Sequence, residues 1–237
     1  MSFFSGLFRR PCPLDLRGFT DRHCHILPGV DDGIETLEES LRVLDAYEQA
    51  GIAAVWLTPH IMEDIPNTSD FLRLRFDELR QAYAGSVSLH LAAENMPDSV
   101  FQERLEKNDI LTVEGDKVLV ETSYFNPPIK FNETLKQVLE RGFRPLLAHP
   151  ERYNYINDVA YYHKSKNNGV LFQGNLMSLS GYYGPAVKQK AMYLLKTGLY
   201  DCFGSDLHDI SHIDVIKQMQ LREPEYNAFV SVLNFQI

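Results

Sequence analysis

From residue 18 onward, short apolar runs alternate with segments whose apolar residues recur at helical spacing. The run 53–58 (AAVWLT) is apolar almost throughout, which is typical of a parallel strand covered on both faces. Strands are predicted at residues 18–23, 53–58, 87–93, 118–120, 145–148, 170–172 and 199–203. A helical segment follows each of them, and this alternation predicts parallel strands joined by right-handed crossovers.

Capping residues mark where the predicted helices begin and end. Thr36 and Glu39 form a capping box, in which each side chain satisfies a backbone N–H at the start of a helix. Asn132 is predicted to cap the helix between the fourth and fifth strands. Glycines that end helices are predicted at Gly51, Gly85, Gly142, Gly169 and Gly198. A last helix is predicted within residues 213–221.

Two architectures fit this alternation, an open doubly wound sheet and a closed barrel. No Gly-rich dinucleotide-binding loop follows the first strand, which disfavours the open sheet. We therefore predict an α/β fold, a single-domain (β/α)7 distorted TIM-like barrel of parallel strands spanning residues 18–237. Residues 1–17 are predicted to form a loose N-terminal tail, with contact to a partner or a membrane surface as the alternative.

Composition narrows the class of protein. The chain has 237 residues and a formal net charge of −9, which argues against a nucleic-acid binder. No apolar run approaches the roughly 18–20 residues that a membrane span needs. Three cysteines are too few for a disulfide framework, so we predict a cytoplasmic location. The oligomeric state, a homo-oligomer included, is left open.

Histidines and carboxylates stand at the carboxyl ends of the predicted strands, where such barrels place functional residues. They are His23, His25, Asp31, Asp32, His60, Glu94, Glu121, His149, Asp206 and His208, with Arg152 close to His149 in the sequence. Taken singly, a strand-end histidine is usually a packed core residue, and an Asp-Asp-Gly sequence is an ordinary turn. Gathered at one rim, imidazoles and carboxylates are the ligands that divalent metal ions coordinate.

The candidate ligands are too many for one metal ion, which takes about four to six. Two ions would use more of them, and three ions fit best, with Glu94 as a candidate bridge. Four carboxylates and three divalent ions would give the rim a net charge of about +2, which would make it an electrophilic site for an anion. Such a cluster clamps a phosphoryl group and activates a water. Mixed nitrogen and oxygen donors suit Mn, Fe, Zn or Co.

Other phosphatase and hydrolase chemistries lack their motifs. None of Cys12, Cys24 and Cys202 has an arginine six positions further on, as a cysteine phosphatase requires. Neither a GxSxG elbow nor a Walker P-loop occurs. Strand alternation places His23 and His25 on one face and turns Cys24 away, as a packed residue.

Six motifs, in order, resemble the PHP-type phosphoesterases. They are HCHILPGVDDG (23–33), LTPH (57–60), AAE (92–94), LVETS (119–123), LLAHPERY (146–153) and GSDLH (204–208). Within that superfamily they most resemble the bacterial manganese-dependent protein-tyrosine phosphatases of capsular and exopolysaccharide synthesis, over about residues 18–212. The resemblance implies a PHP-type barrel and the hydrolysis of phosphotyrosine, with a bacterial tyrosine kinase tail as substrate. The alternatives are a small phosphate ester, such as histidinol phosphate, and a non-catalytic binding module.

The resemblance also implies a trinuclear Mn²⁺ centre. Its three ligand sets are His23, His25, Glu94 and Asp206; Glu94, Glu121 and His149; and Asp32, His60 and His208. Spacing alone does not choose between Asp31 and Asp32. Arg152 would bind the phosphate, the alternative being a salt bridge at a helix start, and Arg152, Asp206 and His208 are the expected catalytic residues.

Two departures from the family pattern bear on the substrate. Residues 209–221 contain no arginine after the GSDLH motif, which makes His212 the nearest candidate cation for the substrate. Met96 stands near Glu94 where an aromatic residue is expected. A group of tyrosines is predicted mainly to pack loops, the alternative being to stack on an aromatic substrate: Tyr153, Tyr155, Tyr161, Tyr162, Tyr182 and Tyr183.

Overall fold

The computed structural model describes residues 11–233, and strands alternate with helices along them as predicted. The strands are β1 (Pro11–Pro13), β2 (Thr20–Cys24), β3 (Ala54–Leu57), β4 (His60–Ile61), β5 (Ser88–Leu91), β6 (Glu94–Asn95), β7 (Lys117–Val120), β8 (Arg144–Ala148), β9 (Leu171–Asn175), β10 (Cys202–Gly204) and β11 (Gln220–Arg222). The helices are α1 (Leu37–Gln49), α2 (Ser69–Ala82), α3 (Ser99–Glu106), α4 (Phe131–Glu140), η1 (Pro150–Arg152), α5 (Val159–Asn167), α6 (Leu176–Ser180), α7 (Pro185–Lys196), α8 (His212–Lys217) and α9 (Glu223–Leu233).

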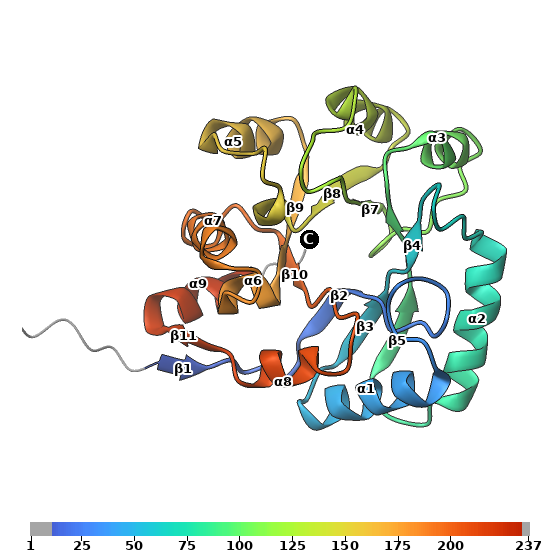
Figure 1. Ribbon diagram of the computed structural model, residues 1–237, viewed down its shortest axis with the longest axis vertical. Helices are drawn as coiled ribbons and strands as arrows, with labels where there is room; N and C mark the ends of the chain where they lie inside the picture. The colour runs from blue at the N-terminus through green and yellow to red at the C-terminus, as the bar shows by residue number, and fades with distance from the viewer. Residues whose placement is uncertain (1–10, 234–237) are drawn as a thin grey trace, which may run out of the picture.

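Parallel pairing joins the strands into two larger sheets, of order β2-β3-β5 and β10-β9-β8-β7-β6-β4. The two sheets share chain segments, because β4 follows β3 and β6 follows β5 after two residues each. At the other edge, His25 N donates to Leu207 O at 2.9 Å and Asp206 N donates to His23 O at 2.7 Å. Figure 1 shows the strands of these two sheets in the middle of the molecule, most of the helices around them, and β1 at its edge. The predicted α/β class with parallel sheets is confirmed.

Two of the predicted helix starts can be compared with the structure. Thr36 Oγ1 accepts a hydrogen bond from Glu39 N at 3.2 Å and donates to the Glu39 carboxylate at 3.1 Å, so α1 begins where the capping box predicted. The Asn132 cap was wrong. α4 already begins at Phe131, after Lys130 with φ 63°. Phe131 N donates to Pro128 O, and this turn after the two prolines starts the helix earlier than Asn132 would.

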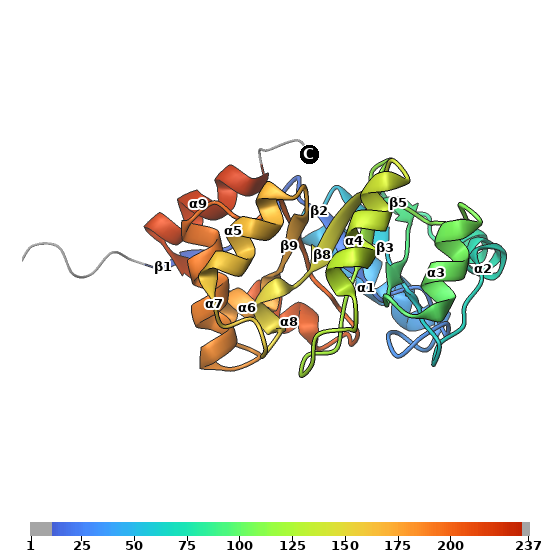
Figure 2. The same ribbon diagram turned by 90° about the horizontal axis from the view of Figure 1, so that it is seen from above.

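The C-terminal segment contains elements that the pattern did not predict. α8 lies at residues 212–217, close to the prediction of a helix within 213–221, but β11 and α9 follow it. β1 pairs antiparallel with β11, with Cys12 opposite Leu221, so three residues of the expected loose tail are held in a sheet. Residues 1–10 lie outside the described chain. Both views show β1 beside α9, far from α2 (Figures 1 and 2).

The core lies on both sides of the strands, because alternate residues of a strand point to opposite faces. Val118 and Val120 of β7 belong to the large cluster shared with the helices, whereas Leu119 and Leu146 belong to a smaller cluster of their own. This two-sided burial accounts for the nearly continuous apolar runs of the sequence. Within residues 11–233, no helix combines the length and apolar character that crossing a membrane requires.

We predict that α9 contributes strongly to stability. Phe229 is fully buried, and its ring lies 5.0 Å from that of Phe203 in β10. Phe229→Ala should lower the free energy of unfolding by about 3–5 kcal/mol, as measured by denaturant titration. Phe125→Ala, at a side chain that is 73% exposed, is the matched control and should change it by less than about 0.5 kcal/mol. Equal effects of the two changes would mean that α9 does not pack on the strands.

Candidate metal centre

The predicted ligands come together at the carboxyl ends of the strands. Three groups each place their ligand atoms within 4.8 Å of one another: His25, Asp32, His60 and His208; His23, His25, Glu94 and Asp206; and His60, Glu94 and Glu121. His149 Nε2 joins them, 3.3 Å from Glu94 Oε1 and 3.8 Å from Glu121 Oε2. The structure thus brings all nine sequence-predicted ligands into one cluster.

The deepest group surrounds the Glu94 carboxylate. His23 Nε2 and His25 Nε2 lie 3.1 and 3.3 Å from Glu94 Oε2, and 3.4 and 3.5 Å from Asp206 Oδ1. His60 Nδ1 is also 3.3 Å from Glu94 Oε2. Neither Glu94 oxygen has a hydrogen-bond partner within residues 11–233, although both atoms are buried. A buried carboxylate without donors is costly unless a cation neutralises it, so this residue fits a bridging metal ligand.

The charges of the cluster support the same conclusion. Burial raises the pKa of Glu121 well above its usual range, and the nearby Glu94 and Asp206 carboxylates raise it further. Burial opposes ionisation of Glu94 too, but the surrounding imidazoles hold its pKa well below the usual range. Burial and the adjacent His25 lower the pKa of His60 to about 4, the direction that favours the neutral imidazole of a metal ligand. At His23 and His25, by contrast, burial is outweighed by the neighbouring carboxylates, which raise the pKa of both imidazoles. The donor set therefore fits divalent metal ions.

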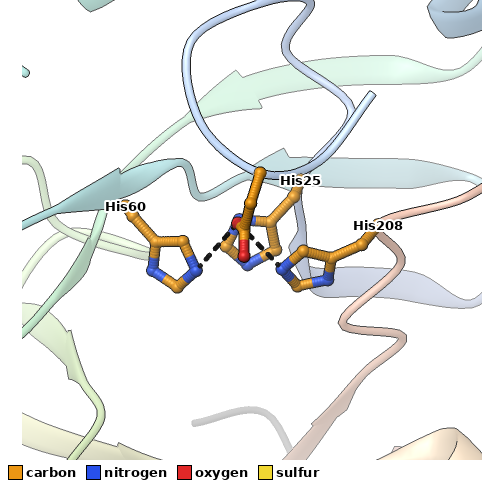
Figure 3. A group of neighbouring side chains, drawn as sticks. His25, His60 and His208 are labelled. Atoms are coloured by element: carbon orange, nitrogen blue, oxygen red, sulfur yellow. Dashed lines mark ion pairs between the residues drawn. The ribbon is translucent and has the colours of Figure 1, made fainter. Parts of the chain in front are cut away.

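Asp31 and Asp32, which spacing could not separate, face different partners. Asp32 Oδ1 lies 3.4 Å from His60 Nε2 and 3.5 Å from His208 Nε2. Figure 3 shows these two imidazoles and that of His25 around the carboxylate. Asp31 Oδ2 instead accepts hydrogen bonds from His25 Nδ1 at 2.8 Å and from His60 N at 3.0 Å. Asp32 thus belongs to the ligand cluster, and Asp31 orients the outer nitrogen of His25.

Gln173, which directly follows the predicted strand at 170–172, plays the same part for His23. Gln173 Oε1 lies 2.6 Å from His23 Nδ1, and Gln173 Nε2 donates to Arg22 O at 3.1 Å. Because the amide orientation is fixed, His23 Nδ1 is the donor and Nε2 is left to the cluster. Such outer contacts select the tautomer of a ligand histidine. No sequence motif marks this contact, since Gln173 is 150 residues from His23.

Two glycines let the His23 and His25 segments approach their neighbours. A Cβ on Gly204 would lie 2.3 Å from His23 Cβ, and one on Gly33 would lie 2.1 Å from His25 O. The backbone is also unusual at two ligands, since φ is 33° at His149 and 53° at Asp206. Left-handed backbone at such residues is costly and tends to occur at functional sites.

A cavity of about 530 Å³ opens above the cluster. Six of the nine ligands line it, namely Asp32, His60, Glu94, Glu121, Asp206 and His208, together with Arg152, His212, Tyr124, Tyr182, Tyr183, Met62, Ile65 and Met96. Arg152 donates from Nη1 to Asp206 Oδ2 at 2.5 Å, and not to a residue of its own short helix. Both ring nitrogens of His212 are engaged: Nδ1 accepts from His208 N, and Nε2 meets the Tyr182 hydroxyl.

The tyrosines divide into two groups. Tyr153 and Tyr162 are buried and pack loops, as predicted for most of the group, and Tyr155 and Tyr161 lie against the same core. Tyr182 and Tyr183 line the cavity, and Tyr182 is 51% exposed. Tyr124, which the sequence analysis did not single out, also lines the cavity, and its position beside the LVETS motif is the only signal for it.

Known proteins are similar to this chain in sequence. The family profile "Capsular polysaccharide synthesis, CpsB/CapC" matches residues 19–219. "Tyrosine-protein phosphatase YwqE" of Bacillus subtilis is 27% identical over 197 residues, or 80% of this chain and 77% of that protein. "Tyrosine-protein phosphatase CpsB" of Streptococcus pneumoniae is 27% identical over 203 residues, or 80% and 83%.

Solved structures show the same fold. One described as YwqE from Bacillus subtilis and CpsB from Streptococcus pneumoniae, "unique metal-dependent tyrosine phosphatases", matches with a TM-score of 0.77. It is 24% identical and covers 92% of this chain and 96% of its own, which shows a shared fold.

The fold and the cluster together define a class, that of parallel α/β proteins with a site for divalent metal ions at the carboxyl ends of the strands. Within that class the family match is specific, because it spans 19–219 of the 237 residues. This chain belongs to the CpsB/CapC family of capsular polysaccharide synthesis.

We predict that Gly204 is needed for the close approach of His23. In Gly204→Ala the added methyl would separate β10 from β2, and Mn²⁺ affinity measured by calorimetry should fall roughly tenfold or more. Gly174→Ala is the matched control, because its Cβ would lie 2.4 Å from the Phe203 ring rather than from a ligand. Both changes should lower the melting temperature, but only the first should weaken metal binding. Equal affinities in the two variants would contradict this role of Gly204.

Proposed function

We propose that this chain is a metal-dependent protein-tyrosine phosphatase, in which divalent metal ions held by the cluster would activate the water that hydrolyses phosphotyrosine. The observation that carries the proposal is the buried Glu94 carboxylate, ringed by imidazoles and without a hydrogen-bond donor, at the base of a cavity that Arg152 lines. The names of the related proteins YwqE and CpsB, tyrosine-protein phosphatases, point to the same reaction.

We infer that the strands close into the (β/α)7 barrel predicted from the sequence. The shared segments β3–β4 and β5–β6 join the two sheets on one side. The hydrogen bonds from His25 N to Leu207 O and from Asp206 N to His23 O join them on the other. A closed arrangement would aim every strand end at one rim, where the candidate ligands lie.

We infer three divalent ions, with Mn²⁺ as the metal and Fe, Zn or Co as alternatives. The proposed ligands are His23, His25, Glu94 and Asp206 for one ion, Glu94, Glu121 and His149 for a second, and Asp32, His60 and His208 for a third. Bound divalent ions polarise a phosphoryl oxygen and lower the pKa of a coordinated water. In the structure, His25 lies close to the ligand atoms of both the Asp32 and the Asp206 groups, and His60 to those of both the Asp32 and the Glu121 groups, which supports a compact centre over separate sites.

The protein's own residues would bind and orient the phosphate. Arg152, held at Nη1 by Asp206, would grip phosphate oxygens through its remaining N–H groups. The proposed catalytic role of Asp206 is to join this arginine to the cluster, since its Oδ1 faces His23 and its Oδ2 faces Arg152. His208 Nδ1 lies 2.9 Å from Asp206 O, which directs Nε2 toward Asp32. His212 would contact the substrate at the edge of the cavity through Nε2, in place of the Tyr182 hydroxyl that this nitrogen meets in the structure.

We propose a protein substrate, the phosphotyrosine tail of a bacterial tyrosine kinase that controls capsular or exopolysaccharide synthesis. The family match and the exposed Tyr182 at the mouth of the cavity support a partner larger than a metabolite. A small phosphate monoester such as histidinol phosphate is the alternative substrate. We propose a cytoplasmic location, since Cys24 and Cys202 are buried thiols outside any disulfide.

We predict that a phosphotyrosine peptide has a higher kcat/KM with Mn²⁺ than a phosphoserine peptide or histidinol phosphate. Exhaustive chelation should abolish the activity. Thiol alkylation should not change it, because no cysteine has the arginine six positions further on that a cysteine phosphatase requires. His23→Ala should lower kcat by orders of magnitude. His163→Ala should not, because His163 lies in α5, where its side chain meets Tyr193 of α7. Full activity without metal would refute the mechanism, and a preference for histidinol phosphate would favour the alternative substrate.

We predict that Arg152→Ala lowers kcat by about 10²–10³, because one charge-stabilising donor is lost from the transition state. Metal content should be unchanged, since a guanidinium is not a ligand. Arg152→Lys should recover part of the activity, because it keeps the charge but not the planar fork. Arg80→Ala, at an exposed arginine of α2, is the control. Unchanged kcat and KM in Arg152→Ala would make Arg152 a purely structural partner of Asp206.

A further inference from the structure

The Arg152 guanidinium lies between two tyrosine rings. Its Cζ is 4.5 Å from the centre of the Tyr124 ring and 4.1 Å from that of the Tyr183 ring. Tyr124 comes from the loop after β7, and Tyr183 from the segment between α6 and α7. Two loops that are far apart in the sequence therefore enclose one arginine, whose side chain is only 17% exposed.

Each ring is held by contacts to the strand ends. The Tyr183 hydroxyl accepts a hydrogen bond from Asn175 Nδ2 at 3.3 Å, and the same amide donates to Asp206 Oδ2 at 2.9 Å. The Tyr124 ring stacks on Tyr153, with centres 6.1 Å apart and 26° between the planes. Tyr153 is fully buried and donates to Ala148 O at the end of β8. The rings are thus part of the fixed frame of the site.

A long arginine side chain samples many rotamers unless its surroundings restrict it. Asp206 fixes one nitrogen of Arg152, Nη1, but a single contact leaves the guanidinium plane free to turn about it. The two rings attract the cation through their negative faces and restrict the tilt of that plane. Within residues 11–233, Nε and Nη2 of Arg152 have no hydrogen-bond partner, so these donors remain for a ligand in the cavity.

We propose that Tyr124 and Tyr183 are positioning residues that clamp the Arg152 guanidinium, so that its unpaired N–H groups point at the phosphate. This inference rests on the proposed function, because it assumes that Arg152 binds the phosphoryl group. The clamp orients the N–H donors of Arg152 in the folded protein. Part of the entropy that phosphate binding would otherwise cost is therefore lost before the substrate binds. Arg152 lies over the rings of Tyr124 and Tyr183, whereas Tyr182, which is 51% exposed, offers the cavity a ring without a cation over it among the described residues.

The clamp predicts that ring faces matter more than hydroxyl groups. Tyr124→Leu and Tyr183→Leu should each lower kcat/KM roughly 2- to 30-fold, and Tyr124→Phe and Tyr183→Phe should lower it less, because the ring face is kept. The affinity of the Mn²⁺-loaded protein for inorganic phosphate, measured by competitive inhibition, should fall by a similar factor. Mn²⁺ content should stay the same in all four variants.

A double-mutant cycle separates clamping from other effects. On the Arg152→Ala background, Tyr124→Leu and Tyr183→Leu should cost no further activity, because the side chain that they position is gone. Tyr193→Leu, which removes a ring of α7 near His163, should have the same small effect on either background. Additive losses on the two backgrounds would overturn the clamp and assign the rings to the substrate instead.

A substitution that keeps the ring shape guards against a folding defect. Phenylalanine and pentafluorophenylalanine at position 183 fill nearly the same space, but fluorination removes the negative face of the ring. The fluorinated protein should bind inorganic phosphate more weakly than the phenylalanine variant at an equal melting temperature, and equal binding would refute the clamp. If the wild-type protein binds phosphate but does not hydrolyse phosphotyrosine, the proposed function fails while the clamp is still tested.

Discussion

The arrangement of the site depends on one electrostatic constraint: negative charge is buried away from water at the carboxyl ends of the strands. Glu94 is buried with both oxygens lacking a donor in the described chain, and Glu121 and Asp206 lie beside it. Carboxylates in this position repel one another, and burial removes the water that would otherwise separate them. Imidazoles at 3.1–3.3 Å relieve part of the repulsion, and divalent cations would relieve the rest. The neighbouring loops, glycines and strained residues hold this concentration of charge in place.

The ligand side chains converge because contacts outside the cluster fix the ring nitrogens that point away from it. Asp31 orients His25, Gln173 orients His23, and two glycines remove the Cβ atoms that would keep these segments away from their neighbours. Unfavourable backbone conformations, such as the left-handed one at His149, persist only where the surrounding structure determines them. The cluster is therefore a property of the packed strand ends, and a single loop could not form it.

Local signals in the sequence were enough to predict seven of the parallel strands, most of the helices and the residues of the cluster, apart from the choice of Asp32 over Asp31. Strand burial on both faces produces apolar runs, and ligands at strand ends stand beside these runs, so both can be found by position alone. The β1–β11 pair was missed because Pro11-Cys-Pro13 lacks strand character, and Pro is tolerated only at such an edge. The Gln173 contact was missed because it joins residues 150 positions apart. Contacts of this kind arise from packing and have no local pattern.

Asp206 connects the two halves of the proposed chemistry. Its Oδ1 lies 3.4–3.5 Å from the nitrogens of His23 and His25, and its Oδ2 accepts from Arg152 and Asn175. One carboxylate thus sets the distance between the metal cluster and the guanidinium. Asn175 also donates to Tyr183, so the ring that covers Arg152 is tied to the same carboxylate. The metal-facing oxygen, the arginine and the Tyr183 ring are therefore linked through the side chain of Asp206.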